Sequence, residues 1–297
     1  MSNDFSFSFP GLGIDNIKLN TVAFSIFGKE VAWYGLILTF GFILSAYYCY
    51  RKLKKKGIVT DDFLDLAIYT IVFGVIGARV FYVLTTLSDY DSFLDMIAIW
   101  NGGLALYGGF IGGAVAAILV LRHKKMNIPL TFDALAPAMM LGQIIGRWGN
   151  FVNGECYGST SLFEFFGKKF DITSLNSNNP FVMNILRDSK IIFAQPTFLY
   201  ESVWNLIGFI LINIFYKKKK YDGQIFLWYI TWYGFGRMII ESLRTDSLYI
   251  GAFKASQLIG LVCFLIGLIS LIVLKIKNRN TIGPLYINKE VKEDDNN

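Results

Sequence analysis

Seven apolar segments, each long enough to cross a lipid bilayer, constrain the fold of this chain more than any other feature. A membrane-spanning helix needs roughly 20 mostly apolar residues. Only 17% of the 297 residues are charged, whereas a soluble protein usually carries about 25%, so the chain cannot cover a water-exposed surface. We therefore expect an all-α polytopic membrane protein with seven transmembrane helices. The segments are residues 31–50, 63–86, 103–121, 130–148, 196–216, 224–243 and 254–274.

The basic residues predict the orientation of these helices. They are concentrated in four runs, at residues 51–56, 122–125, 217–220 and 275–279, and each run follows an odd-numbered segment. Lys and Arg are enriched in cytoplasmic loops. The N-terminus is therefore expected outside and the C-terminus in the cytoplasm. The net charge of +6 is explained by this bias and does not indicate a nucleic-acid partner.

The parts outside the apolar segments differ in character. Residues 25–275 form the expected membrane domain. Residues 1–24 carry four Phe among polar residues, a pattern typical of an external arm that lies on the membrane surface. The polar stretch at about 150–195 predicts a small external head between the fourth and fifth helices. Residues 276–297 end in KEVKEDDNN and have too little apolar content to fold, so we expect a disordered cytoplasmic tail.

Polar and ionisable residues gather in the outer halves of the predicted helices. A charge in a membrane span costs about 2.5 to 3.5 kcal/mol, so each is a candidate for function. The sixth segment places Tyr233, Arg237 and Glu241 on one helical stripe, because they are four residues apart, and Arg244 continues the stripe three residues further on. An alternative is that Arg237 and Glu241 only neutralise each other. The other candidates in the outer half are Tyr34, Arg79, Arg147, Asn150, Asn153, Glu155 and Glu201.

The arginines favour an anionic ligand over a purely structural network. The planar guanidinium binds phosphate oxygens through two parallel hydrogen bonds and stays charged, and a phosphate at the bilayer surface suggests a phospholipid. Gly102 and Gly103 lie where a helix N-terminus would attract an anion. Tyr107 either faces the ligand or anchors the helix at the interface. The glycines at residues 108–113 are better explained by close helix packing.

The segment GRWGNFVNGECYG at residues 146–158 closely resembles the signature of the bacterial prolipoprotein diacylglyceryl transferase family. The likeness covers about residues 25–275. Further blocks resemble the family in the same order, namely AWYG at 32–35, GAR at 77–79, IWNGGLALYGG at 99–109, QPTFLYES at 195–202 and YGFGRMIIESLR at 233–244.

This resemblance implies an enzyme of the bacterial cytoplasmic (inner) membrane, with its active site towards the outer face. Such an enzyme transfers a diacylglyceryl group from phosphatidylglycerol to the lipobox cysteine thiol of preprolipoproteins and releases glycerol phosphate. The chain departs from the family at two positions, since many members have His where this chain has Tyr107 and Gln195. Its single His is His123, in a cytoplasmic basic run. The functional residues implied by the resemblance are Tyr34, Arg147, Asn150, Glu155, Gly158, Tyr233, Arg237 and Glu241.

Without a site histidine, we expect charge stabilisation to dominate the chemistry. Arg147 and Arg237 would form a preorganised clamp on the phosphate, and their positive potential would favour the thiolate, which normally forms near pH 8.5. Glu241 and Glu155 would position the arginines, and Tyr107 would relay the thiol proton. We expect no metal and no other cofactor. The remaining substrate contacts are predicted at Tyr34, Arg79, Asn150, Asn153, Gly158, Glu201, Tyr233, Gly102 and Gly103.

Two other functions stay open at this point. Intramembrane Arg and Glu also mark the substrate paths of transporters, although many transporters show inverted repeats and no repeat is visible here. A phospholipid-binding protein without catalysis is the second alternative, favoured only by the missing histidines. The sequence leaves the acyl-chain preference, the peptide entry route and the oligomeric state undetermined.

Overall fold

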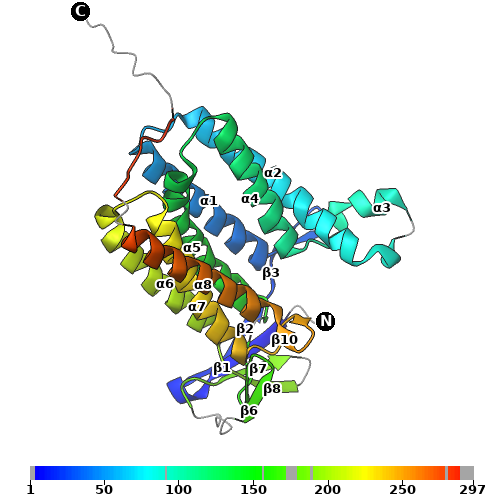
Figure 1. The fold of residues 1–297 in the computed structure, drawn as a ribbon. Coiled ribbons are helices and arrows are strands. Elements are labelled where there is room, and N and C mark those ends of the chain that lie inside the picture. The colour runs from blue at the N-terminus through cyan, green and yellow to red at the C-terminus, as the bar shows by residue number, and fades with distance from the viewer. Residues whose placement is uncertain are drawn as a thin grey trace, which may run out of the picture. The chain divides into compact units, whose positions relative to one another are not determined.

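A computed structural model describes residues 4–90, 92–155, 157–171, 179–187, 190–277 and 280–287, and it is mostly helical (Figure 1). Within this part of the chain, one long helix occupies each of the seven predicted segments. They are α1 Trp33–Lys54, α2 Thr60–Thr85, α4 Leu106–His123, α5 Ile128–Val152, α6 Thr197–Phe215, α7 Gln224–Ile240 and α8 Ala255–Ile276. Apolar segments form helices in lipid because a helix satisfies its own backbone hydrogen bonds.

Six of these helices are long and apolar enough to cross a membrane, judged by length and composition. The exception is α7, which has 17 residues. This is consistent with the expected polytopic membrane protein. Short helical turns connect the longer elements, namely η1 Pro10–Leu12, η2 Leu87–Asp89, α3 Phe93–Ile97, η3 Ile99–Asn101, η4 Tyr216–Lys218 and η5 Glu241–Leu243.

The chain divides into two compact units, one of Met1–Cys49 with Asp133–Thr281 and the other of Tyr50–Phe132 with Ile282–Asn297. In the second unit, α2 and α4 lie side by side (Figure 1). A Cβ on Gly77 would lie only 2.5 Å from the carbonyl oxygen of Gly108. The close helix packing predicted for the glycines of this stretch is therefore confirmed.

The strands correct the expected all-α class. They are β1 Asp4–Phe9, β2 Ile14–Asn20, β3 Val22–Ile26, β4 Lys29–Ala32, β5 Leu162–Phe165, β6 Lys168–Asp171, β7 Met183–Arg187, β8 Lys190–Ala194, β9 Tyr249–Ile250 and β10 Phe253–Lys254. In the first unit, β1 pairs antiparallel with β2 and with β7, and β7 pairs with β8.

The start of the chain is part of this sheet and differs from the arm that we expected. Phe5, Phe7 and Phe9 are buried and pack in one cluster with Met183 and Phe198. The alternation of Phe with polar residues is the period-two pattern of a strand with one buried face. Its partner strand β7 lies far along the chain, so no local pattern indicates that this face is covered.

The segment before the C-terminus also differs from the disordered tail that we expected. Leu285 is buried, and its carbonyl oxygen accepts a hydrogen bond from the N–H of Asn127 at 2.7 Å. Ile287 donates its N–H to the carbonyl oxygen of Lys125 at 2.8 Å. Residues 288–297, where the tail prediction also falls, lie outside the described residues.

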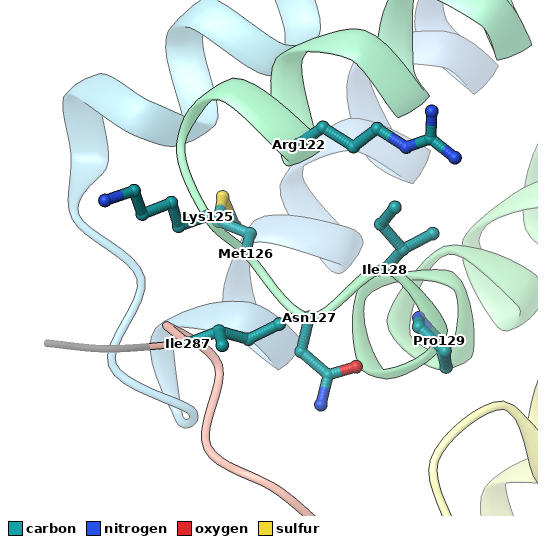
Figure 2. Close-up of a pocket in the computed structure, with 7 residues that line it drawn as sticks. All are labelled: Arg122, Lys125, Met126, Asn127, Ile128, Pro129 and Ile287. Carbon is teal, nitrogen blue, oxygen red and sulfur yellow. The ribbon is translucent and has the colours of Figure 1, made fainter.

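A pocket of about 430 Å³ lies beside this segment, between Ile287 and the connection from α4 to α5 (Figure 2). Arg122 and Lys125 both line it, but their side chains extend in opposite directions (Figure 2). The two cations therefore do not converge on one point, as they would in a site for a single anion.

Candidate functional site

An ion-pair network in the first unit joins α5, α6 and α7. Glu201 of α6 is 3% exposed and lies between two arginines. Nη2 of Arg147, on α5, is 2.5 Å from Glu201 Oε2. Nη1 of Arg237, on α7, donates to both Glu201 oxygens, at 2.9 and 3.0 Å. A buried charge is strongly destabilising without its partner, so these three side chains hold one another in place.

A second carboxylate extends the network at the end of α7. Glu241 is 1% exposed, and its Oε2 is 2.7 Å from Nη2 of Arg237. Nη1 of Arg244 lies 3.8 Å from Oε1 of Glu201. The stripe predicted for the sixth segment is thus observed at Arg237, Glu241 and Arg244, although η5 continues it beyond the last residue of α7.

The charges of this network balance. Arg244 also forms a two-pronged pair with Asp246, in which Nε to Oδ1 and Nη2 to Oδ2 are both 3.0 Å. Burial alone would raise the pKa of the Asp246 carboxyl, but the hydrogen bond and charge of Arg244 outweigh it and hold that pKa below its usual value. The described residues therefore set three carboxylates, those of Glu201, Glu241 and Asp246, against the three guanidinium groups of Arg147, Arg237 and Arg244.

Arg147 is the most accessible arginine of the network. Its side chain is 17% exposed, against 12% for Arg237 and 9% for Arg244. Besides Glu201, Arg147 contacts Asn150 through Nη1 at 3.4 Å. Arg237 has more partners within the protein, because its Nη2 also donates to Ser256 Oγ at 3.1 Å. An anion approaching the network would therefore meet Arg147 first.

The signature segment continues from Arg147 into a tight turn. Gly149 allows the ring of Tyr34 to approach α5, since a Cβ there would be 3.2 Å from Tyr34 Cδ2. The amide of Asn153 donates to Oε1 of Glu155, and the Glu155 N–H donates to the Asn150 carbonyl oxygen at 3.0 Å. Among the described residues Glu155 contacts no arginine, so the expected arginine-positioning role is not supported.

Gly158 joins three parts of the first unit through its backbone. It exchanges two 2.9 Å hydrogen bonds with Gln195, and the following Ser159 donates to the carbonyl oxygen of Leu243 at 2.7 Å. A Cβ on Gly158 would lie 2.7 Å from Thr197 Cγ2 and 3.2 Å from the Leu243 oxygen. Its place in the signature is therefore explained by backbone packing.

Substituting Gly158 by Ala is expected to lower the free energy of unfolding by about 1–3 kcal/mol, because the added methyl overpacks this junction. Thermal unfolding in detergent measures the change. Gly35→Ala is the matched control, since no atom lies within 4 Å of the Cβ that it adds. Equal melting temperatures for the two variants would contradict the packing role.

Tyr233 lies one helical turn before Arg237 on α7. Its ring stacks on Tyr229, with centroids 5.8 Å apart, and the Tyr229 hydroxyl accepts a hydrogen bond from Gln143 at 2.9 Å. The ring of Tyr233 is therefore packed on Tyr229, which is itself fixed by Gln143.

In the second unit, Arg79 is buried and bound by backbone oxygens. Its Nε donates to Met96 at 2.8 Å and its Nη2 to Asp95 at 2.7 Å. Its Nη1 donates to Gly102 and Gly103 at 2.6 and 3.0 Å. The guanidinium organises the loop that leads into α4, so the substrate contact predicted for Arg79 is replaced by a structural role.

The glycines of this loop do not form a helix N-terminus. Gly102 and Gly103 have φ of +82° and +71°, and α4 begins only at Leu106. Both carbonyl oxygens point at Arg79, which argues against the anion site predicted there. Tyr107 follows in the first turn of α4 and is half-buried.

Arg79→Lys is expected to loosen residues 95–103, because one ammonium cannot reach the four oxygens that the guanidinium fork bonds. Buried carbonyls left without donors cost about 1–3 kcal/mol each. Amide hydrogen exchange of this loop should accelerate at least about tenfold, with Arg122→Lys, an exposed arginine of the same unit, as control. Unchanged exchange would refute the role.

Two basic residues of this region, Arg244 and Lys254, were not predicted as site residues. Arg244 was noted on the stripe but given no role. Lys254, on β10, is 2% exposed, and its Nζ donates to the carbonyl oxygens of Glu241 and Arg244 at 3.1 and 2.7 Å. Burial lowers the pKa of Lys254. Its signal in the sequence was a lysine at the start of the seventh predicted segment, outside the four basic runs.

The structure therefore brings together, in the first unit, Arg147, Glu201, Arg237, Glu241 and Arg244, with Asn150 beside Arg147 and the ring of Tyr34 against Gly149. Arg79, Gly102, Gly103 and Tyr107 belong to the second unit. Among the described residues, no group of three His, Cys, Asp or Glu side chains is placed to hold a metal ion. The arrangement offers a buried, charge-balanced network with one partly exposed guanidinium, which suits a phosphate.

Comparison with known proteins shows which sequences this chain is similar to. The sequence profile of the family described as prolipoprotein diacylglyceryl transferase matches residues 21–273. A phosphatidylglycerol–prolipoprotein diacylglyceryl transferase of Enterococcus faecalis is 37% identical over 284 residues, which is 93% of this chain and 97% of that protein. One from Streptococcus pneumoniae is 40% identical over 278 residues, covering 92% of this chain and 99% of the relative.

Proposed function

Because this chain belongs to the prolipoprotein diacylglyceryl transferase family, we propose that it transfers the diacylglyceryl group of phosphatidylglycerol to the lipobox cysteine of preprolipoproteins. The product is a thioether, and glycerol phosphate is released. The observation that carries the proposal is the pairing of Glu201 with both Arg147 and Arg237, three residues that lie within the part of the chain that matches the family.

The chemistry follows from what these side chains offer. The cysteine sulfur bonds to the glyceryl carbon that carries the phosphate ester, and the bond from that carbon to the phosphate oxygen breaks. The electron pair leaves with the oxygen, so the leaving group needs positive charge nearby more than it needs a proton. Arg147 contacts this phosphate. Arg237, which pairs with the same carboxylate of Glu201, adds its positive charge to the potential that stabilises the leaving group. Asn150 and Tyr34 orient the head group.

The site faces the outer side of the bacterial cytoplasmic membrane, with the N-terminus outside. This topology is supported by the four basic runs, which follow α1, α4, α6 and α8. It requires α7 to be a seventh span. Its 17 residues extend about 25 Å at 1.5 Å per residue, and η5 lengthens the helical path at its end.

The activity is tested with purified protein, labelled phosphatidylglycerol and a lipobox peptide. The parent chain should form the thioether, and Arg147→Ala should lower kcat/KM by about 100-fold or more. Arg51→Ala, in the last turn of α1, is the control and should retain full activity. A folded parent chain that binds phosphatidylglycerol without forming product would refute the transferase and leave a lipid-binding protein.

Tyr107→Phe is expected to lower kcat by about 100-fold at neutral pH, because the phenol passes the thiol proton to water. The deficit should shrink above pH 8.5, where the thiol ionises without help. The pH dependence of kcat measures this, with Tyr69→Phe, an exposed tyrosine of α2, as control. Full activity of Tyr107→Phe at every pH would exclude the relay.

A further inference from the structure

An apolar groove of about 460 Å³ lies along α6, α7 and α8 in the first unit, where these helices run side by side (Figure 1). This volume is within the range of small-molecule sites. Its walls are almost entirely aliphatic and aromatic. Side chains that define it include Trp204, Leu211, Phe215, Trp232, Phe235 and Phe264.

Three side-chain polar groups of the groove wall, those of Trp204, Trp232 and Thr231, are hydrogen-bonded within the protein. Trp204 and Trp232 stack with centroids 4.2 Å apart, and each indole N–H donates to the other residue's carbonyl oxygen, at 3.1 and 3.0 Å. The hydroxyl of Thr231 donates to Leu227 at 2.7 Å. These three groups therefore add little polarity to the wall, and the surface that it offers an occupant is mainly apolar.

One end of the groove begins within one turn of the ion-pair network along α6 and α7. On α6, Trp204 is three residues from Glu201, and on α7, Phe235 is two residues from Arg237. From Trp204 to Phe215 the groove follows α6 for about 16 Å, at 1.5 Å per residue. The apolar channel thus starts about one helical turn along α6 from Glu201, the carboxylate that Arg147 contacts.

We propose that this groove holds one acyl chain of the phosphatidylglycerol molecule that reacts, an inference that rests on the proposed transferase function. A phospholipid carries its phosphate and acyl chains on one glycerol, so its two ends match the charged network and the groove beside it. Burying the chain contributes about 0.8 kcal/mol for each methylene removed from water, and less from lipid, so the groove orients the glyceryl carbon more than it adds affinity.

The position of the chain is tested by photolabelling in nanodiscs. Phosphatidylglycerol with a diazirine near the end of one acyl chain should label peptides of α6, α7 and α8 that line the groove. Phosphatidylcholine with the same diazirine chain is the comparison, and it should label them at least about tenfold less. Equal labelling by both lipids would mean a bystander bilayer lipid and overturn the proposal, as would labelling confined to other helices.

A variant then tests whether the groove serves the reaction. Leu211 lines the groove on α6, about 15 Å along the helix from Glu201. Leu211→Trp should raise KM for phosphatidylglycerol with 16-carbon chains about tenfold. It should leave KM for eight-carbon chains unchanged, since those are too short to reach this depth. Ile210→Trp, on the adjoining lipid-exposed face, is the matched control and should alter neither value.

The outcomes separate the two proposals. An equal rise in KM for both chain lengths in Leu211→Trp, or no rise for either, would overturn the groove assignment. The transferase activity of the parent chain would still stand. If the parent forms no thioether with either lipid, the proposed function fails. Selective phosphatidylglycerol labelling in the groove would then still support the site as one for this lipid.

Discussion

Replacing Glu201 by Gln should reduce transferase activity by about 100-fold or more. Glu201 is the buried carboxylate between Arg147 and Arg237, and Gln keeps its shape but removes its charge. The guanidinium groups of Arg147 and Arg237 would then repel each other without a shared partner, and Arg147 would move from the position in which it meets the phosphate. The loss of a preorganised charge in an enclosed site typically costs a factor of this size.

Because Glu201 acts by positioning the arginines, the loss of activity in Glu201→Gln should exceed any loss that comes from unfolding of the protein. Glu201→Asp keeps the charge and should recover part of the activity, whereas Glu201→Gln should not. Asp15→Asn, an exposed carboxylate of β2 in the same unit, is the control. The measurements are kcat and KM for phosphatidylglycerol together with melting temperature. Wild-type kinetics in Glu201→Gln would remove Glu201 from the site.

Replacing Asp133 by Ala should lower the free energy of unfolding by about 3 kcal/mol or more. Asp133 of α5 is completely buried and accepts hydrogen bonds from Lys219 Nζ at 2.8 Å and from the N–H groups of Gly223 and Phe226 at 2.9 Å. It therefore caps the start of α7 and neutralises a buried lysine. Removing one partner of a buried ion pair costs about 3–5 kcal/mol, and losing a helix cap costs about 1 kcal/mol.

Part of this cost is offset because Lys219 keeps a second partner, Asp222, at 2.8 Å. Asp222→Ala is the matched control, since it removes a carboxylate from the same lysine but leaves the cap of α7 intact. It should destabilise the protein less than Asp133→Ala. Unfolding in a denaturant series measures both variants, and equal midpoints would show that capping by Asp133 adds nothing.

The site was only partly predictable. Arg237 and Glu241 could be paired from their spacing, because residues four apart on a helix share a face. Glu201 could not be assigned to Arg147, since the two lie on different helices and their pairing depends on how α5 and α6 pack. Arg79 shows the same limit, because an arginine near glycines suggests an anion site until its four backbone oxygens are seen.

The sequence by itself determined where the long helices lie, because a bilayer requires about 20 apolar residues in a row and that property is local. It also indicated the family, because the signature at residues 146–158 is a continuous stretch. Only the tertiary structure decided that residues 4–9 pair with residues 183–187, and that one glutamate serves two arginines. Those contacts join residues far apart in the chain, and their energies depend on burial and on partners that no local pattern specifies.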